Sequence, residues 1–174
     1  MSRLLGAVLS GGRSSRFGSD KAMATWQGRT LIDHAIDTLR PIVPVVVVVG
    51  RRHGDMPDIA DRPEPGMGPL GGLNAALHHA AAHGFDAVLS VGCDTPRIPA
   101  GLLDRLLRAR GPAFVADLPV IGIWPVGLAS GLDAFLGEPR KHAVRVWASS
   151  VGAVAIDWPM IANINRVEDL DGLA

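Results

Sequence analysis

At 174 residues, the chain has the length of one ordinary domain, and we expect a single domain over residues 1–174. Seventeen basic side chains balance seventeen acidic ones. The formal net charge of zero therefore excludes a globally basic surface for nucleic acid or for an anionic membrane, and any phosphate-binding site must be local. The one cysteine, Cys93, excludes an internal disulfide and fits a reducing, cytoplasmic location.

Short apolar runs alternate with helical patterns along the first two thirds of the chain. The runs are continuous and rich in branched residues, as expected for parallel strands that are covered on both faces. Strands are predicted at Leu4–Leu9, Val45–Val49, 87–91 and 113–116, and helices at 30–40, 70–83 and 99–110. This alternation predicts an α/β fold with a doubly wound, mostly parallel sheet in a three-layer αβα arrangement.

The second half of the chain is less regular. Strands are expected at 119–126 and 152–156, and helices at 128–136, 141–150 and, as a short acidic segment, 167–173. The loops 61–72 and 137–142 are candidates for mobility. The first apolar run superficially resembles the start of a signal peptide. It is too short and lacks a small-residue cleavage site, so a buried first strand is the favoured interpretation.

A glycine-rich basic segment, residues 9–21, follows the first predicted strand. Its glycines allow close approach of the backbone to a phosphate and offer amide hydrogens, while Arg13, Arg16 and Lys21 supply the cations that a triphosphate requires. Neither the Rossmann fingerprint nor the P-loop motif fits this spacing. We therefore predict a phosphate-binding loop of another kind, with a solvated basic turn as the alternative.

The segment 92–96, Gly-Cys-Asp-Thr-Pro, follows the predicted strand 87–91. A carboxylate at the end of a central strand, opposite a basic loop, can hold a Mg²⁺ ion that bridges substrate phosphates. An Asp-x-Pro sequence alone is more often a plain turn. Because Asp94 pairs with the glycine-rich segment at the same predicted sheet edge, we interpret it as a metal ligand.

Three weaker clusters remain. The Gly-rich segment 65–73 opens a helix and can receive an anion or a ribose, or is a plain tight loop. Asn163 and Asn165 can hydrogen-bond a ring or a phosphate, or form a helix-entry turn. The basic group at 140–145 can grip an acceptor phosphate, or is a solvated face. The histidines show no metal-ligand spacing, and no serine nucleophile elbow supports acyl chemistry.

Together these motifs resemble the molybdenum cofactor guanylyltransferase family of the MobA type. The family's opening Leu-Ala-Gly-Gly motif and its Asp-Lys end are matched at 9–12 and 20–21. Its Gly-Pro-Leu-x-Gly loop is matched at 68–72, its Cys-Asp-x-Pro segment at 93–96 and its Asn-x-Asn segment at 163–165. The four motifs stand in the family's order, and the resemblance extends over essentially the whole chain.

The resemblance implies a Rossmann-like nucleotidyltransferase fold and transfer of GMP from MgGTP to the phosphate of Mo-molybdopterin. The products are molybdopterin guanine dinucleotide and pyrophosphate, Mg²⁺ is the implied cofactor, and molybdoenzymes or their chaperones are further implied partners. The family's GTP positions fall on Leu9, Gly11, Gly12, Lys21, Asp61 and Asp94, with Asp94 also the Mg²⁺ ligand. Asp94, Arg13 and Lys21 are the expected catalytic residues. The molybdopterin positions fall on Arg16, Gly68, Gly72, Arg140, Lys141, Asn163 and Asn165.

The chain departs from the family pattern at two positions. Val49, followed by Gly50 and Arg51, stands where members often have an Asn that touches the nucleotide, so that contact is lost or is taken over by Arg51. Leu118-Pro119 stands where members usually carry His-Pro. Two alternatives stay open. One is a cytidylyltransferase for the same cofactor; Gly12 argues against it, because that sister family tends to have Ala at this position. The other is a catalytically silent relative that binds and delivers the cofactor.

Overall fold

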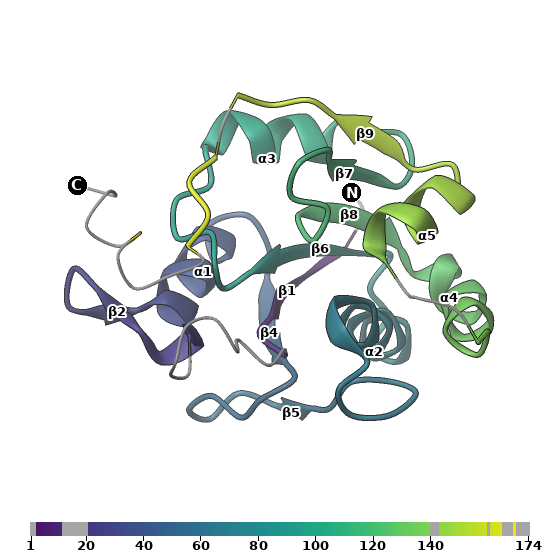
Figure 1. The fold of residues 1–174 in the computed structure, drawn as a ribbon, viewed down its shortest axis with the longest axis horizontal. Coiled ribbons are helices and arrows are strands. Elements are labelled where there is room, and N and C mark those ends of the chain that lie inside the picture. The colour runs from purple at the N-terminus through teal and green to yellow at the C-terminus, as the bar shows by residue number, and fades with distance from the viewer. Residues whose placement is uncertain (1–2, 12–20, 140–142, 160, 165–168, 170–174) are drawn as a thin grey trace.

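The computed structural model describes residues 3–11, 21–139, 143–159, 161–164 and 169. Within these residues, seven strands form one sheet with helices on both faces (Figure 1). The order across the sheet is β5 (Asp58–Ile59), β4 (Val45–Val49), β1 (Leu4–Leu9), β6 (Ala87–Gly92), β8 (Gly122–Pro125), β7 (Ala113–Val115) and β9 (Val154–Ile156). The helices are α1 (Leu31–Leu39), α2 (Gly68–Ala82), α3 (Ala100–Leu107), α4 (Ala129–Leu136) and α5 (Val144–Ser150), with 3₁₀ turns η1 (Lys21–Met23) and η2 (Val126–Leu128).

Strand β1 lies at the centre of the sheet, parallel to β4 on one side and to β6 on the other. Its last residue, Leu9, pairs with Val49 of β4 and with Gly92 of β6. Every residue of β6 is buried, as is β1 from Leu5 onward. Continuous apolar runs suit strands that are covered on both faces. The three strands therefore end together, at one edge of the sheet.

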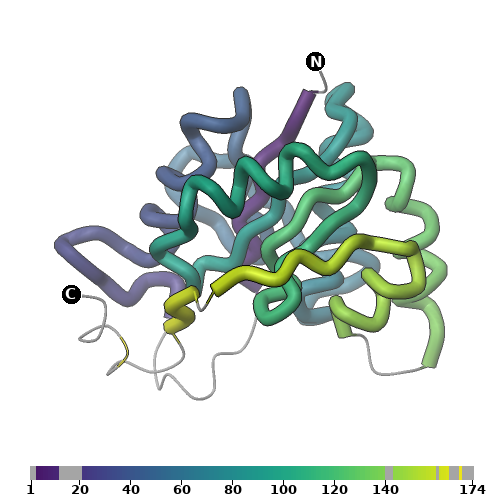
Figure 2. The backbone as a smooth tube through the Cα atoms, turned by 90° about the horizontal axis from the view of Figure 1, so that it is seen from above, coloured from purple at the N-terminus to yellow at the C-terminus, as the bar shows by residue number. Residues whose placement is uncertain are grey.

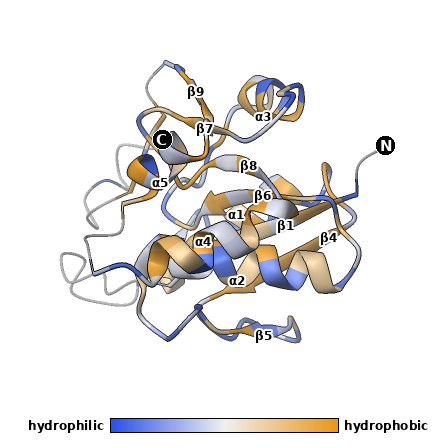
Figure 3. Cartoon of the chain, turned by 90° about the vertical axis from the view of Figure 1, so that its right-hand side faces the viewer, coloured by the Kyte–Doolittle hydropathy of each residue, from blue (hydrophilic) through white to orange (hydrophobic). Residues whose placement is uncertain are grey.

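The helices divide the core into two parts, one on each face of the sheet. On one face, α2, α4 and α5 pack around residues such as Leu77 and Trp147. On the other face, α1 and α3 pack around residues such as Ile32 and Leu102. Figure 3 shows the hydrophobic strand β4 beside helix α2. The predicted three-layer α/β fold with a mostly parallel sheet is confirmed.

Strand β8 makes the sheet mixed, because it runs antiparallel to both β6 and β7. Its Trp124 is fully buried, and the indole N–H donates to the Ser90 hydroxyl of β6 over 2.9 Å. That hydroxyl in turn donates to the carbonyl of Val120 over 2.6 Å, so the polar atoms inside the sheet are hydrogen-bonded. The predicted strand 119–126 is too long, since Val126 already begins the turn η2.

Three further differences concern short or glycine-rich segments. The hairpin of β2 (Thr25–Trp26) and β3 (Arg29–Thr30) was not predicted; it turns through Gln27 and Gly28 at positive φ and extends from the body of the molecule (Figures 1 and 2). Helix α2 begins at Gly68, within the predicted loop 61–72, with a proline in its first turn. Helix α5 begins at Val144 rather than at 141, and the predicted helix 167–173 lies, except for residue 169, outside the described residues.

In the part of the chain that the structure describes, no helix has the length and apolar character needed to cross a membrane.

Candidate active site

The candidate site lies where β1, β4 and β6 end, because each strand passes there into a loop that carries polar residues. The loops touch through their backbones. Ser10 donates both its amide and its hydroxyl to the carbonyl of Val49, over 3.0 Å and 2.9 Å. Gly50 donates its amide to the carbonyl of Ile59 over 2.8 Å, which ties the β4 end to β5. The site is therefore built on rigid strand ends, the usual position of ligands in open α/β sheets.

Gly11 and Gly50 form the closest of these contacts. Gly50 has φ +89°, a backbone conformation that residues with a side chain rarely adopt, and a Cβ on it would lie 2.6 Å from the Cα of Gly11. A Cβ on Gly11 would in turn lie 3.1 Å from an oxygen of Asp61. Glycine at both positions lets two loops and a carboxylate approach one another without intervening side chains.

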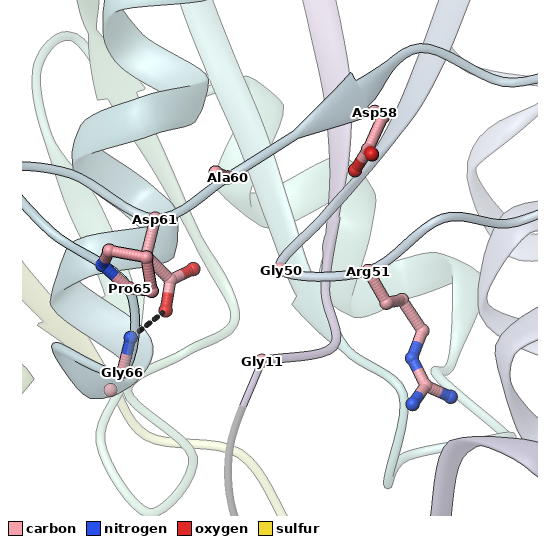
Figure 4. Close-up of a pocket in the computed structure, with 9 residues that line it drawn as sticks. Gly11, Gly50, Arg51, Asp58, Ala60, Asp61, Pro65 and Gly66 are labelled. Carbon is pink, nitrogen blue, oxygen red and sulfur yellow. Dashed lines mark hydrogen bonds between the residues drawn. The ribbon is translucent and has the colours of Figure 1, made fainter.

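A cavity of about 710 Å³ opens beside this contact (Figure 4). Its walls come from the ends of β1, β4 and β5 and from the entry to α2. The lining residues are Gly11, Gly50, Arg51, Asp58, Ala60, Asp61, Pro65, Gly66 and Gly68. The volume is that of a small-molecule ligand pocket.

Asp61 lies at the enclosed end of the cavity and is only 8% exposed. The amide of Gly66 donates to its Oδ2 over 3.3 Å, whereas its buried Oδ1 has no hydrogen-bond partner among the described residues. Burial raises the pKa of this carboxyl group above its ordinary value, and the Gly66 hydrogen bond offsets only part of that effect. A buried carboxylate oxygen without a partner is costly unless a ligand donates to it.

Lys21 and Asp94 meet at the other end of the site. The Lys21 ammonium nitrogen lies 3.4 Å from Oδ2 of Asp94, and their side chains are 14% and 36% exposed. The Thr95 hydroxyl donates to the other carboxylate oxygen over 3.4 Å. Asp94 thus keeps lone pairs open to the solvent side, while Lys21 brings the end of the glycine-rich segment to the end of β6.

Cys93, between Gly92 and Asp94, is a poor nucleophile. Burial, followed by the neighbouring Asp94 carboxylate, raises the pKa of its thiol to about 11, and the charges of Lys21 and Arg51 offset this only in part. The thiol is therefore protonated near neutral pH.

The closing segment of the chain packs against the Asp94 loop. The amide of Ile164 donates to the carbonyl of Asp94 over 2.8 Å, and its side chain is buried against Leu31. The neighbouring Asn163 has a buried side-chain oxygen without a hydrogen-bond partner in the described part of the chain. An amide available for a ligand therefore lies beside the Lys21–Asp94 pair.

The predicted site residues divide into three groups. Leu9, Gly11, Gly68 and Gly72 gather around Asp61: Gly68 lines its cavity, and a Cβ on Gly72 would lie 3.5 Å from both Asp61 Oδ1 and Leu9 Cδ2. Lys21, Asp94 and Asn163 form the other end. Gly12, Arg13, Arg16, Arg140, Lys141 and Asn165 lie outside the described residues. Gly66 belongs to the Gly-rich segment 65–73 that the sequence singled out, whereas sequence reasoning missed Gly50 and Asp58 as parts of the cavity. The signal available was that Gly50 directly follows a buried strand.

A divalent metal fits this site only if the substrate supplies some of its ligands. Among the described residues, no group of three or more His, Cys, Asp or Glu side chains could form a metal cage. Asp94 offers a single, accessible carboxylate. That donor set suits Mg²⁺, which is commonly held by one or two carboxylates together with substrate phosphates and water.

The model of the MobA-like NTP transferase domain matches residues 6–151, which include Lys21, Asp61 and Asp94. The chain belongs to this family. It is thus a nucleotidyltransferase, of a family that typically uses a divalent metal. The molybdenum cofactor guanylyltransferase of Sinorhizobium fredii is 37% identical, over 89% of this chain and 78% of the relative. That of Acidiphilium cryptum is 36% identical, over 98% of this chain and 93% of the relative.

Solved structures show the same fold in other nucleotidyltransferases. Molybdopterin-guanine dinucleotide biosynthesis protein A from Archaeoglobus fulgidus matches with a TM-score of 0.72 at 20% identity, covering 97% of this chain and 95% of that one. The 2-C-methyl-D-erythritol 4-phosphate cytidylyltransferase of Thermus thermophilus matches with a TM-score of 0.69 at 15% identity, covering 98% of this chain and 96% of that one. The MobA-like fold alone therefore does not separate a guanylyltransferase from a cytidylyltransferase.

Proposed function

We propose that this chain transfers GMP from GTP to the phosphate of Mo-molybdopterin, with molybdopterin guanine dinucleotide and pyrophosphate as products. Membership of the MobA-like family supports nucleotidyl transfer. Relatives at 36% and 37% identity that carry the guanylyltransferase name support guanine and the molybdenum cofactor. The observation that carries the choice of base is the buried Oδ1 of Asp61, which has no partner among the described residues.

Guanine is the base whose edge suits this carboxylate. It presents the ring N1–H and the exocyclic N2 amine side by side, so one carboxylate accepts from both. Cytosine presents a single amine next to a ring nitrogen that is an acceptor, and that acceptor would face a carboxylate oxygen. A buried acceptor left against another acceptor loses affinity. In this proposal Asp61 recognises the base by accepting its hydrogen bonds, and Leu9, Gly11 and Gly12 contact the nucleotide.

The triphosphate extends, in this proposal, from the Asp61 cavity towards Lys21 and Asp94. Lys21, with Arg13 and the amides of the glycine-rich segment, neutralises and aligns the phosphates. Asp94 is the residue that would hold Mg²⁺. When bound there, the ion would stabilise negative charge on the phosphate oxygens of the nucleotide.

The reaction needs no protein nucleophile. An oxygen of the acceptor phosphate forms a bond to the α-phosphorus of GTP, the bond from that phosphorus to the bridging oxygen breaks, and the electron pair leaves with pyrophosphate. The protonated Cys93 thiol takes no part. What the chain contributes is alignment of the two reactants and charges fixed before the reaction.

The acceptor lies, in this proposal, on the side of Asp94 where the closing segment packs. Asn163 has a buried amide oxygen there, ready to accept from a pterin N–H. Arg16, Arg140, Lys141 and Asn165 complete the proposed acceptor set. Gly68 and Gly72 border the Asp61 cavity, so we assign them to the junction of nucleotide and acceptor.

The test is transfer by the purified chain, supplied with Mo-molybdopterin, Mg²⁺ and either GTP or CTP. We expect pyrophosphate release and the guanine dinucleotide with GTP, and at most about a hundredth of that rate with CTP, because cytosine sets a ring-nitrogen acceptor against a carboxylate oxygen of Asp61. A faster reaction with CTP would identify the chain as the cytidylyltransferase. Binding of molybdopterin without turnover of any triphosphate would identify it as a delivery protein.

A further inference from the structure

Arg51 stands directly after Gly50, at the end of β4, and lines the cavity that contains Asp61. The positive-φ glycine before it turns the chain out of the strand. Figure 4 shows the guanidinium pointing away from the carboxylates of Asp58 and Asp61. Arg51 therefore stands in the wall of the cavity, with its charged end away from the acidic residues that line it.

The charges of the described lining residues favour a cation at this position if an anionic triphosphate binds beside them. Asp58 and Asp61 are the acidic residues that line the cavity, and among its described lining residues Arg51 is the one with a positive charge. Without Arg51, the described lining of the cavity would present two carboxylates and no cation to the strongly anionic triphosphate.

We propose that Arg51 binds the triphosphate of the nucleotide, between the base that Asp61 accepts and the phosphates that Lys21 and Asp94 meet. This inference rests on the proposed function. The planar guanidinium donates two parallel hydrogen bonds to one phosphate group, which a lysine ammonium cannot do. Arg51 is thus a binding residue for the phosphates and leaves the choice of base to Asp61.

Truncated ligands separate a phosphate contact from a structural role. Dissociation constants of GTP, GDP, GMP and guanosine are measured by calorimetry for the wild-type chain and for Arg51→Ala, Arg51→Lys and Arg52→Ala. Arg52 is the matched control, because it is the next residue, carries the same charge and is exposed. For Arg51→Ala we expect affinity for GTP to fall about 10- to 100-fold and affinity for guanosine to change less than about 2-fold.

For Arg51→Lys we expect an affinity for GTP between those of the wild type and the alanine variant, because lysine keeps the charge but cannot donate two parallel hydrogen bonds. Arg52→Ala is expected to stay within about 3-fold of the wild type for every ligand, since an exposed charge is screened. Unchanged guanosine affinity also shows that the variants fold.

Three results would overturn the assignment. Equal losses for GTP and guanosine would mean that Arg51 supports the base or the fold. Unchanged GTP affinity would remove it from the site, and equal effects of the Arg51 and Arg52 substitutions would reduce it to general surface charge. The proposed function fails separately, in the wild type, if the unmodified chain does not prefer GTP to CTP.

Discussion

The two ends of the site are built differently. Asp61 is 8% exposed and is enclosed by the backbones of Gly11, Gly50 and Gly66. The Asp94 side chain is 36% exposed and is held by side chains, at 3.4 Å from Lys21 and from the Thr95 hydroxyl. The surrounding backbone holds the Asp61 carboxylate in one position. The exposed Lys21–Asp94 ion pair can rearrange when phosphates and a metal bind. The enclosed end suits recognition of a flat base, and the open end suits chemistry.

This difference also predicts what each carboxylate contributes to folding. The buried Asp61 carboxylate has one oxygen without a partner in the described residues, so ionising it destabilises the fold. Asp94 is open to solvent and is paired, so replacing its charge should leave the fold nearly unchanged. Substituting each aspartate by the isosteric asparagine tests the two ends separately.

The largest effect is expected for Asp94→Asn. The amide keeps the shape of the side chain but loses the charge that Mg²⁺ and Lys21 require, so we expect transfer to fall at least about 100- to 1,000-fold. Binding of GTP should change much less, because the Asp61 end is intact. Pyrophosphate release and thermal unfolding, measured side by side, check both statements.

The matched control is Asp104→Asn, the same chemical change on the exposed face of α3. It should alter neither turnover nor unfolding. Near-normal turnover in Asp94→Asn would move the metal site elsewhere, and a collapsed melting temperature would make Asp94 a structural residue of its loop.

A smaller effect, of opposite sign, is expected for the stability of Asp61→Asn. Because the folded-state pKa of Asp61 is raised above 3.8, the folded protein binds its proton more tightly than the unfolded chain does. The wild type therefore loses stability as the pH rises from about 3.8 through the raised folded-state pKa. Asp61→Asn lacks this loss, so it should melt at a higher temperature than the wild type at pH 7, by a margin that shrinks towards pH 4. A lower melting temperature for the variant at pH 7 would mean that the carboxylate is satisfied in the free protein.

The strands that carry the site could be predicted from the sequence, because long apolar runs covered on both faces leave a clear pattern. β1 and β4 match their predicted bounds, and β6 extends its prediction by one residue, Gly92. The hairpin β2–β3 and the strand β5 are two residues per strand, too short to show any period. Helix α2 begins earlier than predicted because Gly68 and Pro69, typical loop residues, form its first turn.

The site itself was only partly accessible to such reasoning. Lys21 and Asp94 follow from local motifs, since each stands in or beside a glycine-containing turn after a strand. Asp61 was named from the family resemblance alone, because what makes it special is its burial against Gly11 and Gly50, which are distant in the chain. Arg51 was noted only as a departure from the family, and its position in the cavity wall appears only in the structure.

Recognition of guanine by Asp61 is tested by calorimetric titration of the wild type and Asp61→Asn with GTP, inosine triphosphate and CTP. Inosine keeps the ring N1–H of guanine and lacks the N2 amine. For the wild type we expect affinity to fall about 10-fold from GTP to inosine triphosphate and further, to about 100-fold in all, for CTP, with these differences nearly erased in Asp61→Asn. Equal wild-type affinities for the three triphosphates, or an unchanged preference in the variant, would contradict the claim.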